Sequence, residues 1–239
     1  MTVHFTLQGK GGFGKSMIAG FIAQYYIDKG QPPLGIDTDP VNATLKSMKA
    51  LAARDIQLLD GNRIDTSAFD DVVEMILNYA GPVVVDNGAS SFIPLSNYLA
   101  ENPAVKVLQD AGRTVIVHSI ITGGPSYLET VDGFYQVVEA MPAGVKIVVW
   151  INDFFGPVLS ADGKPFEDLP IYEKTRDRIA AILRLRQKTA ETFGQDIRTM
   201  LEKRQTFAEA IADKDTRLMA KQRLKSTQDE IYQQLALIA

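Results

Sequence analysis

The stretch GKGGFGKS, residues 9–16, decides the fold of this 239-residue chain. It fits the phosphate-loop pattern G-x-x-x-x-G-K-[ST] and lies between an expected strand at residues 3–7 and an expected helix that ends near Gly30. Glycines let the backbone turn its N–H groups toward a phosphate, and the N-terminus of the following helix adds a favourable dipole. The pattern therefore predicts a nucleotide site in which Lys15 contacts the β- and γ-phosphates and the Ser16 hydroxyl binds Mg²⁺.

The following segments alternate between strand-like and helix-like patterns. Short β-branched runs, typical of strands buried on both faces of a parallel sheet, occur at residues 33–37, 83–85, 114–118 and 145–151. Helical patterns lie between them at residues 44–53, 68–79 and 125–140. The alternation predicts an α/β fold with a doubly wound, mainly parallel sheet, which is the P-loop NTPase fold with extra C-terminal helices.

The C-terminal third has a different texture. Residues 153–170 contain two glycines and three prolines and predict a long loop, whereas the 45 residues after Gly194 contain neither. A single helix of that length would extend about 65 Å, which is too long for a domain of this size. We therefore expect at least two helices with a break at residues 213–216. We expect a P-loop ATPase domain at residues 1–194 and a C-terminal helical extension at residues 195–239, packed on the same domain.

Composition and charge exclude several classes of site. The chain has no cysteine and only two histidines, which excludes thiol catalysis, iron–sulfur clusters and cysteine-zinc sites. It has no apolar run of 18 residues and no basic-then-apolar N-terminal signal, so we expect a cytoplasmic protein. Residues 1–171 carry 11 Lys and Arg against 19 Asp and Glu, a net charge of −8. Residues 172–239 carry 14 against 10, a net charge of +4, which predicts different partners for the two portions.

Lys10 makes the phosphate-loop pattern more specific. The run KGGFGKS, which begins at Lys10, resembles the deviant Walker A motif K-G-G-x-G-K-[ST] of the ParA/MinD group of ATPases. The resemblance implies that ATP joins two subunits, with Lys10 reaching across the interface to the partner's nucleotide, and that hydrolysis releases them. The alternative is that Lys10 adds positive charge to its own site. The nucleotide-binding residues that the resemblance implies are Gly11, Gly12, Phe13, Gly14, Lys15, Ser16, Met17 and Asn152.

Acidic side chains follow two of the expected strands. The run DTDPVNAT, residues 37–44, is similar to the family's D-x-D-P-Q-G-N-A-T but is one residue shorter. The match implies that Asp39 orients the attacking water and that Asp37 supports the metal shell. A D-x-D-P turn can also be a loop stabilised by its own side-chain hydrogen bonds. Asp86 ends the apolar run VVVD, where an acid holds Mg²⁺ directly or through water.

Asn152 ends another expected strand, KIVVWI at residues 146–151. In proteins of the ParA/MinD type an asparagine at this place bonds to adenine, and Phe154 or Phe155 would then flank the base. A turn-forming asparagine is the alternative.

Longer segments resemble TraL-type proteins encoded in plasmid conjugal-transfer regions. They are QGKGGFGKS at 8–16, IDTDPVNAT at 36–44, DNGASSFIPLS at 86–96, MLEKRQTFAEAI at 200–211 and KQRLK at 221–225. These segments span nearly the whole chain. The resemblance implies a role in DNA transfer between bacteria or in plasmid maintenance.

Basic side chains gather late in the chain. They are Arg176, Arg178, Arg184, Arg186, Lys188, Lys221, Arg223 and Lys225. ParA-like proteins often hold DNA through such residues, and that binding would be steeply salt-dependent. The alternative is a solvated helix face, because ten acidic residues share this portion. We expect no membrane anchor at residues 231–239, which lack flanking lysines.

These patterns together predict an ATP-binding, slowly hydrolysing dimerisation switch that uses ATP and Mg²⁺. Lys10 and Lys15 would carry transition-state charge, Asp39 would orient water, and a protein of the transfer or partition machinery would be a partner. One alternative is a P-loop small-molecule kinase or synthetase, which needs a substrate pocket rich in Arg or Lys, and no such cluster is evident before residue 172. The other alternative is an adaptor that binds nucleotide without hydrolysing it.

Overall fold

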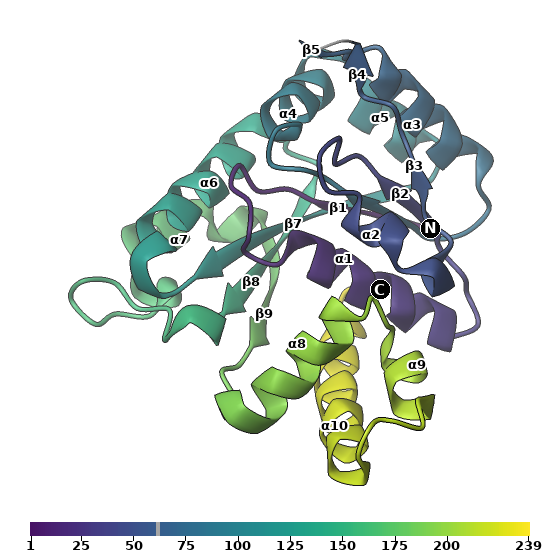
Figure 1. The fold of residues 1–239 in the computed structure, drawn as a ribbon. Coiled ribbons are helices and arrows are strands. Elements are labelled where there is room, and N and C mark those ends of the chain that lie inside the picture. The colour runs from purple at the N-terminus through teal and green to yellow at the C-terminus, as the bar shows by residue number, and fades with distance from the viewer. Residues whose placement is uncertain (61–62) are drawn as a thin grey trace.

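A computed structural model describes residues 1–60 and 63–239. Its centre is a seven-stranded sheet with the order β3-β2-β6-β1-β7-β8-β9, and every neighbouring pair is parallel (Figure 1). The strands are β1 (Thr2–Thr6), β2 (Leu34–Asp37), β3 (Arg54–Asp55), β6 (Val83–Asp86), β7 (Thr114–Thr122), β8 (Lys146–Asn152) and β9 (Ile179–Leu185). A separate antiparallel pair joins β4 (Leu59–Asp60) to β5 (Arg63–Ile64). The predicted parallel sheet is confirmed.

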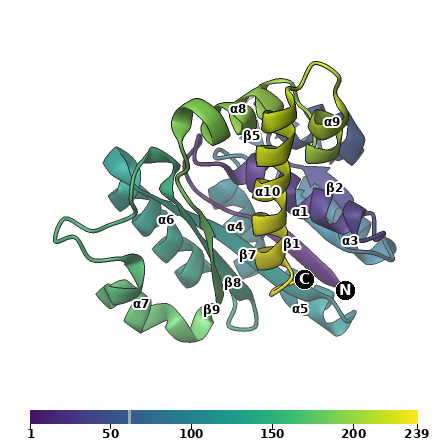
Figure 2. The same ribbon diagram turned by 90° about the horizontal axis from the view of Figure 1, so that it is seen from below.

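Helices cover both faces of the sheet (Figures 1 and 2). They are α1 (Lys15–Asp28), α2 (Thr44–Ser47), α3 (Ala68–Asn78), α4 (Phe92–Glu101), α5 (Ala104–Asp110), α6 (Tyr127–Ala140), α7 (Pro170–Thr175), α8 (Gln195–Glu202), α9 (Phe207–Ala212) and α10 (Leu218–Leu235). One face carries α3 to α7, and the other carries α1, α2 and α8 to α10. The double winding follows from this arrangement.

Alternate residues of each central strand enter two different cores. In β6, Val83 and Val85 pack toward α3 to α6, whereas Val84 packs toward α1. Trp150 of β8 lies in the α1 core and is fully buried. Apolar side chains on both strand faces explain why these strands are continuous apolar runs in the sequence.

Two local predictions need correction. The helix expected at residues 44–53 is instead the short α2 followed by a 3₁₀ turn at Lys49–Leu51. The chain turns back there because β3 pairs with β2, and Ala52 takes a left-handed φ of 48° at the turn. Strand β9 was not predicted at all. It is a sheet-edge strand whose burial is mostly partial, and arginines flank its apolar residues, so its pattern is weak.

The C-terminal helices pack on α1. The predicted break at residues 213–216 is confirmed, since α9 ends at Ala212 and α10 begins at Leu218. Phe21 of α1 stacks on Phe207 at a centroid distance of 5.2 Å, and Tyr25 meets Tyr232 edge-on at 5.3 Å. The division of the chain into residues 1–194 and 195–239 stays a prediction.

Candidate functional site

The phosphate loop joins the carboxyl end of β1 to the N-terminus of α1. Gly12 and Gly14 have φ values of 86° and 102°, which residues with a β-carbon rarely adopt. The helix starts at once, because the Ile18 N–H donates to the Gly14 carbonyl at 2.9 Å. A β-carbon at Gly11 or Gly12 would meet nothing within 4 Å. The loop therefore presents open space beside the N-terminus of a 14-residue helix, as phosphate binding requires.

Lys15 points into this loop rather than into solvent. Its side chain is buried, and its Nζ donates to the Lys10 carbonyl at 2.8 Å. Burial lowers the pKa of Lys15, while the charges of Asp86 and Asp39 act in the opposite direction. A buried ammonium with so few partners is suited to receive an anion.

Asp86 lies beside Lys15 at the end of β6. Its Oδ1 accepts a hydrogen bond from the Thr6 hydroxyl at 2.9 Å, and its buried Oδ2 has no hydrogen-bond partner among the described residues. Burial raises the pKa of Asp86 to about 7, although hydrogen bonds from Ser16 and Thr6 and the charge of Lys15 oppose the shift. An unpartnered carboxyl oxygen near the Ser16 hydroxyl fits the donor set of a Mg²⁺ site.

Asp37 and Asp39 shape the loop that follows β2. Asp37 accepts from the backbone N–H groups of Asp39 (3.1 Å) and Lys46 (3.0 Å), and burial raises the pKa of Asp37. Asp39 Oδ1 accepts from the N–H groups of Val41 (2.9 Å) and Asn42 (3.1 Å). The loop-stabilising alternative is therefore present for both carboxylates. Their roles toward water and metal stay predictions.

A buried polar network links this loop to the loop after β6. The Thr38 hydroxyl donates to Asn87 Oδ1 at 3.1 Å, and the Ser91 hydroxyl donates to the same oxygen at 2.8 Å. A β-carbon at Gly88 would lie 2.7 Å from the Asp39 carboxyl carbon, so only glycine permits this approach. Sequence reasoning missed the network. The short polar run DNGASS was its only visible signal.

Asn152 reaches the phosphate loop from β8. Its Nδ2 donates to the Phe13 carbonyl at 3.1 Å, and its Oδ1 accepts from the Phe154 N–H at 3.1 Å. The asparagine thus supports the loop backbone and also forms the expected turn. Its bond to adenine stays a prediction. Phe154 is half-exposed, and the side chain of Phe155 lies outside the described part of the structure.

A hollow of about 380 Å³ opens beside Asn152 at the carboxyl ends of β8 and β9. It is lined by residues that follow β8, by one residue of β9 and by residues that follow β9: Asp153, Pro157, Arg184, Arg186 and Gln187. Sequence reasoning placed no cationic cluster near the nucleotide because these arginines follow residue 172. Strand β9 brings them to the same edge of the sheet, so the absence of such a cluster no longer argues against a kinase or synthetase.

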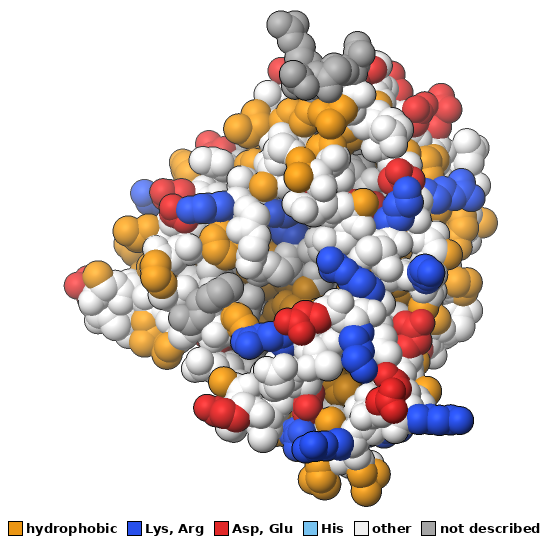
Figure 3. All heavy atoms as spheres, viewed as in Figure 1, with side chains coloured by type: hydrophobic (Ala, Val, Ile, Leu, Met, Phe, Trp, Pro, Cys, Tyr) orange, Lys and Arg blue, Asp and Glu red, His pale blue; other side chains and the backbone are white. Residues whose placement is uncertain are grey.

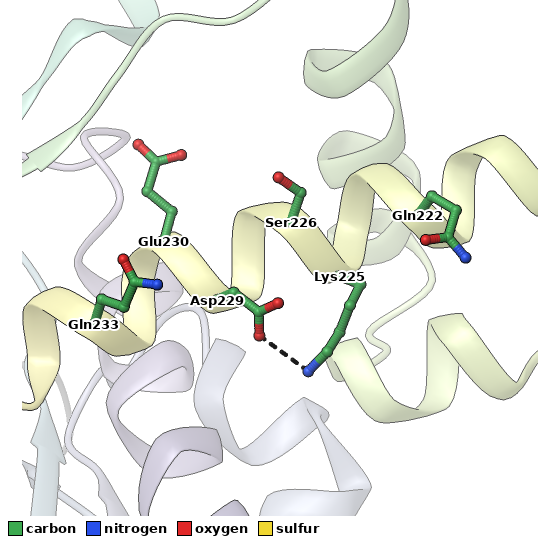
Figure 4. Close-up of a pocket in the computed structure, with 6 residues that line it drawn as sticks. All are labelled: Gln222, Lys225, Ser226, Asp229, Glu230 and Gln233. Carbon is green, nitrogen blue, oxygen red and sulfur yellow. Dashed lines mark ion pairs between the residues drawn. The ribbon is translucent and has the colours of Figure 1, made fainter.

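A second hollow, of about 430 Å³, runs along α10 (Figure 4). It is lined by Gln222, Lys225, Ser226, Asp229, Glu230 and Gln233. These residues form one polar stripe along a single helix, with an ion pair of 3.0 Å between Lys225 and Asp229. No strand end contributes to it, so it is separate from the phosphate loop.

The basic C-terminal residues mostly bind within the chain. Arg178 donates to the Met141 and Pro142 carbonyls at the end of α6, both at 2.8 Å. The further contacts are Arg176 with Glu173, Arg184 with Glu167, Lys188 with Glu230, Arg223 with Asp196 and Lys225 with Asp229. Figure 3 shows acidic and basic side chains intermixed over the C-terminal helices. These contacts favour the interpretation of the basic residues as part of a solvated helix face. DNA binding stays a prediction.

Within residues 231–239, Ile231 and Leu235 are buried in the α1 core, whereas Leu237 is exposed. Within residues 1–60 and 63–239, no helix has both the length and the apolar composition needed to cross a membrane.

Lys10 turns toward α6. Its ammonium pairs with the Glu129 carboxylate in the first turn of α6. The structure places Lys15 and Ser16 in the first turn of α1, Asp37 and Asp86 at the ends of the neighbouring strands β2 and β6, and Asp39 in the loop after β2. Their roles toward nucleotide and metal stay predictions. Met17 stands next to the loop, with its Cε 3.1 Å from where a β-carbon on Gly14 would lie.

Comparisons with known proteins agree with this fold. No model of a known protein family matches the chain. A protein TraL of Escherichia coli is 48% identical over 233 residues, which cover 98% of this chain and 96% of the relative. A second E. coli protein TraL is 45% identical over the same shares. Among solved structures, the MinD cell division protein of Aquifex aeolicus is similar, with a TM-score of 0.54, 17% identity and coverage of 96% and 95%. The chain therefore belongs to the TraL family and has the fold of MinD-type P-loop ATPases.

Proposed function

We propose that this protein is an ATP-binding, slowly hydrolysing dimerisation switch of the ParA/MinD type that acts in plasmid conjugal transfer or maintenance. ATP would join two copies in the cytoplasm, and hydrolysis would separate them. The proposed ligands are ATP and Mg²⁺, and the proposed partners are a second copy and a protein of the transfer or partition machinery. DNA is a further proposed partner, through the C-terminal part.

One observation carries the proposal. Lys15 and Asp86 are both buried at the mouth of the phosphate loop. The Lys15 ammonium donates to the Lys10 carbonyl, and among the described residues Asp86 Oδ2 accepts no hydrogen bond. Burial of a charged group without compensation is costly. A phosphate anion would satisfy Lys15, and a divalent cation would satisfy Asp86, so bound Mg–ATP would remove both costs at once.

The residues of the chain divide the chemistry between them. Backbone N–H groups of the loop and Lys15 would hold the phosphates, and Ser16, Asp86 and Asp37 would support the cation. Bound Mg²⁺ would neutralise charge on the phosphates. Asp39, fixed by its bonds to two backbone N–H groups, would orient the attacking water. We expect slow hydrolysis because the sequence indicates no strong general base and no arginine finger.

Light scattering after size-exclusion chromatography tests the switch. With Mg–ATP we expect wild type to form some dimer and Asp39→Ala to remain a dimer for longer. Lys15→Ala should lose ATP binding, and Lys10→Ala should bind ATP as a monomer. Lys146→Ala is the matched control, because Lys146 is an exposed lysine at the opposite end of β8. Wild type and Asp39→Ala proteins that both stay monomeric with ATP would refute the proposal.

Phosphate release separates the alternatives. The switch should release phosphate over many turnovers without any acceptor molecule. A non-hydrolysing adaptor would bind ATP and release none. A kinase or synthetase remains a second candidate because Arg184 and Arg186 line the hollow beside Asn152. Replacing Arg186 with Gln would then abolish acceptor-dependent turnover while leaving ATP-dependent dimerisation unchanged.

A further inference from the structure

The ion pair between Lys10 and Glu129 joins residues 119 positions apart. Both side chains are about half exposed, at 54% and 49%. The pair therefore lies on the surface at the mouth of the phosphate loop, where an approaching molecule can reach both groups. In the proposed dimer, Lys10 is the residue that contacts the nucleotide bound to the second copy.

We propose that Glu129 is a positioning residue that holds the Lys10 ammonium on its own chain until the nucleotide phosphates of a second copy replace it. This inference rests on the proposed dimerisation switch. If so, formation of each dimer breaks two such ion pairs. Glu129 therefore raises the protein and ATP concentrations at which dimers form.

Buried contacts fix the part of α6 that carries Glu129. Gln8, two residues before Lys10, donates from Nε2 to the Thr130 carbonyl at 3.3 Å and accepts from the Ser119 hydroxyl at 3.1 Å. A β-carbon at Gly133 would lie 2.4 Å from Gln8 Nε2, so α6 is in direct contact with the segment that joins β1 to the phosphate loop. The first turn of α6 is thus packed against the residues that lead into the phosphate loop. Glu129 is held within reach of Lys10 by packing and not by the ion pair alone.

The position of Glu129 in its helix also suits a negatively charged side chain. Glu129 stands in the first turn of α6, where the helix dipole favours an anion. The ammonium of Lys10 has three donors but a single charge, so a triphosphate and Glu129 compete for it. A triphosphate carries more negative charge than one carboxylate. Exchange of Lys10 from Glu129 to phosphate is therefore favoured once a nucleotide-loaded second copy arrives.

The first test measures the holding contact without any dimer. Nucleotide-free monomer is treated briefly with formaldehyde and a borohydride reagent, and methylation of Lys10 is followed by peptide mass spectrometry. An ion-paired ammonium reacts slowly, so Glu129→Gln should methylate Lys10 at least twofold faster than wild type. The matched control is Asp132→Asn, which removes the same charge from an exposed position of α6. Equal Lys10 rates in all three proteins would overturn the proposal.

The second test measures dimerisation. With Mg–ATP and the Asp39→Ala background, Glu129→Gln should lower the dimer dissociation constant by about 2- to 30-fold, the range for release of two exposed ion pairs. Asp132→Asn should leave it unchanged, and 1 M salt should shrink the difference by screening the pair. An unchanged or weaker Glu129→Gln dimer would overturn the inference. If no variant dimerises with ATP, the proposed function fails, and the methylation result still decides whether Glu129 holds Lys10.

Discussion

Acidification should destabilise this protein through a chain of hydrogen bonds inside the α1 core. Trp150 Nε1–H donates to His118 Nδ1 at 2.9 Å, His118 Nε2 is 2.9 Å from His4 Nδ1, and His4 Nε2 is 2.9 Å from the Tyr26 hydroxyl. Both histidines are fully buried. The indole nitrogen can only donate, so His118 must accept at Nδ1 and carry its proton on Nε2. That proton is donated to His4, whose own proton then sits on Nε2 and is donated to Tyr26.

Each imidazole is therefore neutral, with one proton and no room for a second. Burial lowers the pKa of His4 to about 3, and burial together with the neighbouring His4 holds the pKa of His118 well below its usual range. In the unfolded chain both groups bind a proton below pH about 6.5. The unfolded state then holds more protons than the folded state, so stability is lost as the pH falls below 6.5. For His4 the loss continues down to pH about 3.

The size of the effect follows from this difference. Between pH 8 and pH 5, protonation of one unfolded histidine lowers the free energy of unfolding by about 2 kcal/mol, and two histidines lower it by about 4 kcal/mol. This is a large part of a typical folding stability of ~5–15 kcal/mol. Asp86 acts in the opposite direction, because its raised pKa lets the folded state bind a proton that the unfolded state binds only at lower pH.

A variant isolates the histidine contribution from that of Asp86. His4→Gln keeps a donor and an acceptor at the site but cannot titrate. Urea unfolding at pH 8 and pH 5 should show a pH-dependent loss that is smaller by about 2 kcal/mol in His4→Gln than in wild type, since Asp86 is present in both and cancels. Equal losses in the two proteins would refute the reasoning. So would histidine NMR resonances in folded wild type that titrate between pH 8 and pH 5.

Three other predictions concern backbone contacts. Gly88→Ala should lower stability by about 1–3 kcal/mol in thermal unfolding, because its β-carbon would lie 2.7 Å from the Asp39 carboxyl carbon; an unchanged Tm would contradict this. Gln24→Ala removes the acceptor of the buried Phe207 N–H (2.7 Å) and should cost about 1–3 kcal/mol in urea, whereas Gln24→Glu keeps an acceptor and should lose less. Asn152→Ala should weaken ATP binding about 2- to 10-fold in calorimetry by freeing the loop carbonyl that it binds, and unchanged affinity would show that the loop needs no such support.

The sequence was most informative where local pattern and chemistry coincide. Glycines at fixed spacing, followed by Lys15 and Ser16, can be recognised without any knowledge of distant residues. Asp86 was equally accessible, because an acidic residue directly after a fully apolar run indicates the polar end of a buried strand. Strand β9 was not accessible, since its partial burial and flanking arginines give no clear period. Edge strands meet only one neighbour, so their apolar pattern is weaker than that of central strands.

The remaining site features depend on residues that are distant in sequence. Lys10 meets Glu129, and Arg184 joins the edge that holds Asn152, only because crossover connections bring strand ends together. No spacing rule predicts such pairs from one sequence. The same limit applied to the basic C-terminal residues, where a count of charges left both DNA binding and a solvated helix face open.

Helix α1 connects the phosphate loop to the C-terminal helices. Its first residue, Lys15, belongs to the phosphate loop, while its last turns bind the C-terminal helices. Gln24 accepts the N–H that begins α9, and Asp28 accepts hydrogen bonds from Gln228 (2.9 Å) and Tyr232 (3.0 Å) of α10. These hydrogen bonds are directional, so they fix the orientation of the C-terminal helices on α1 more narrowly than apolar packing alone. The C-terminal helices are thus fastened to the helix that starts at the phosphate loop, so any displacement of α1 as a rigid body would carry them with it.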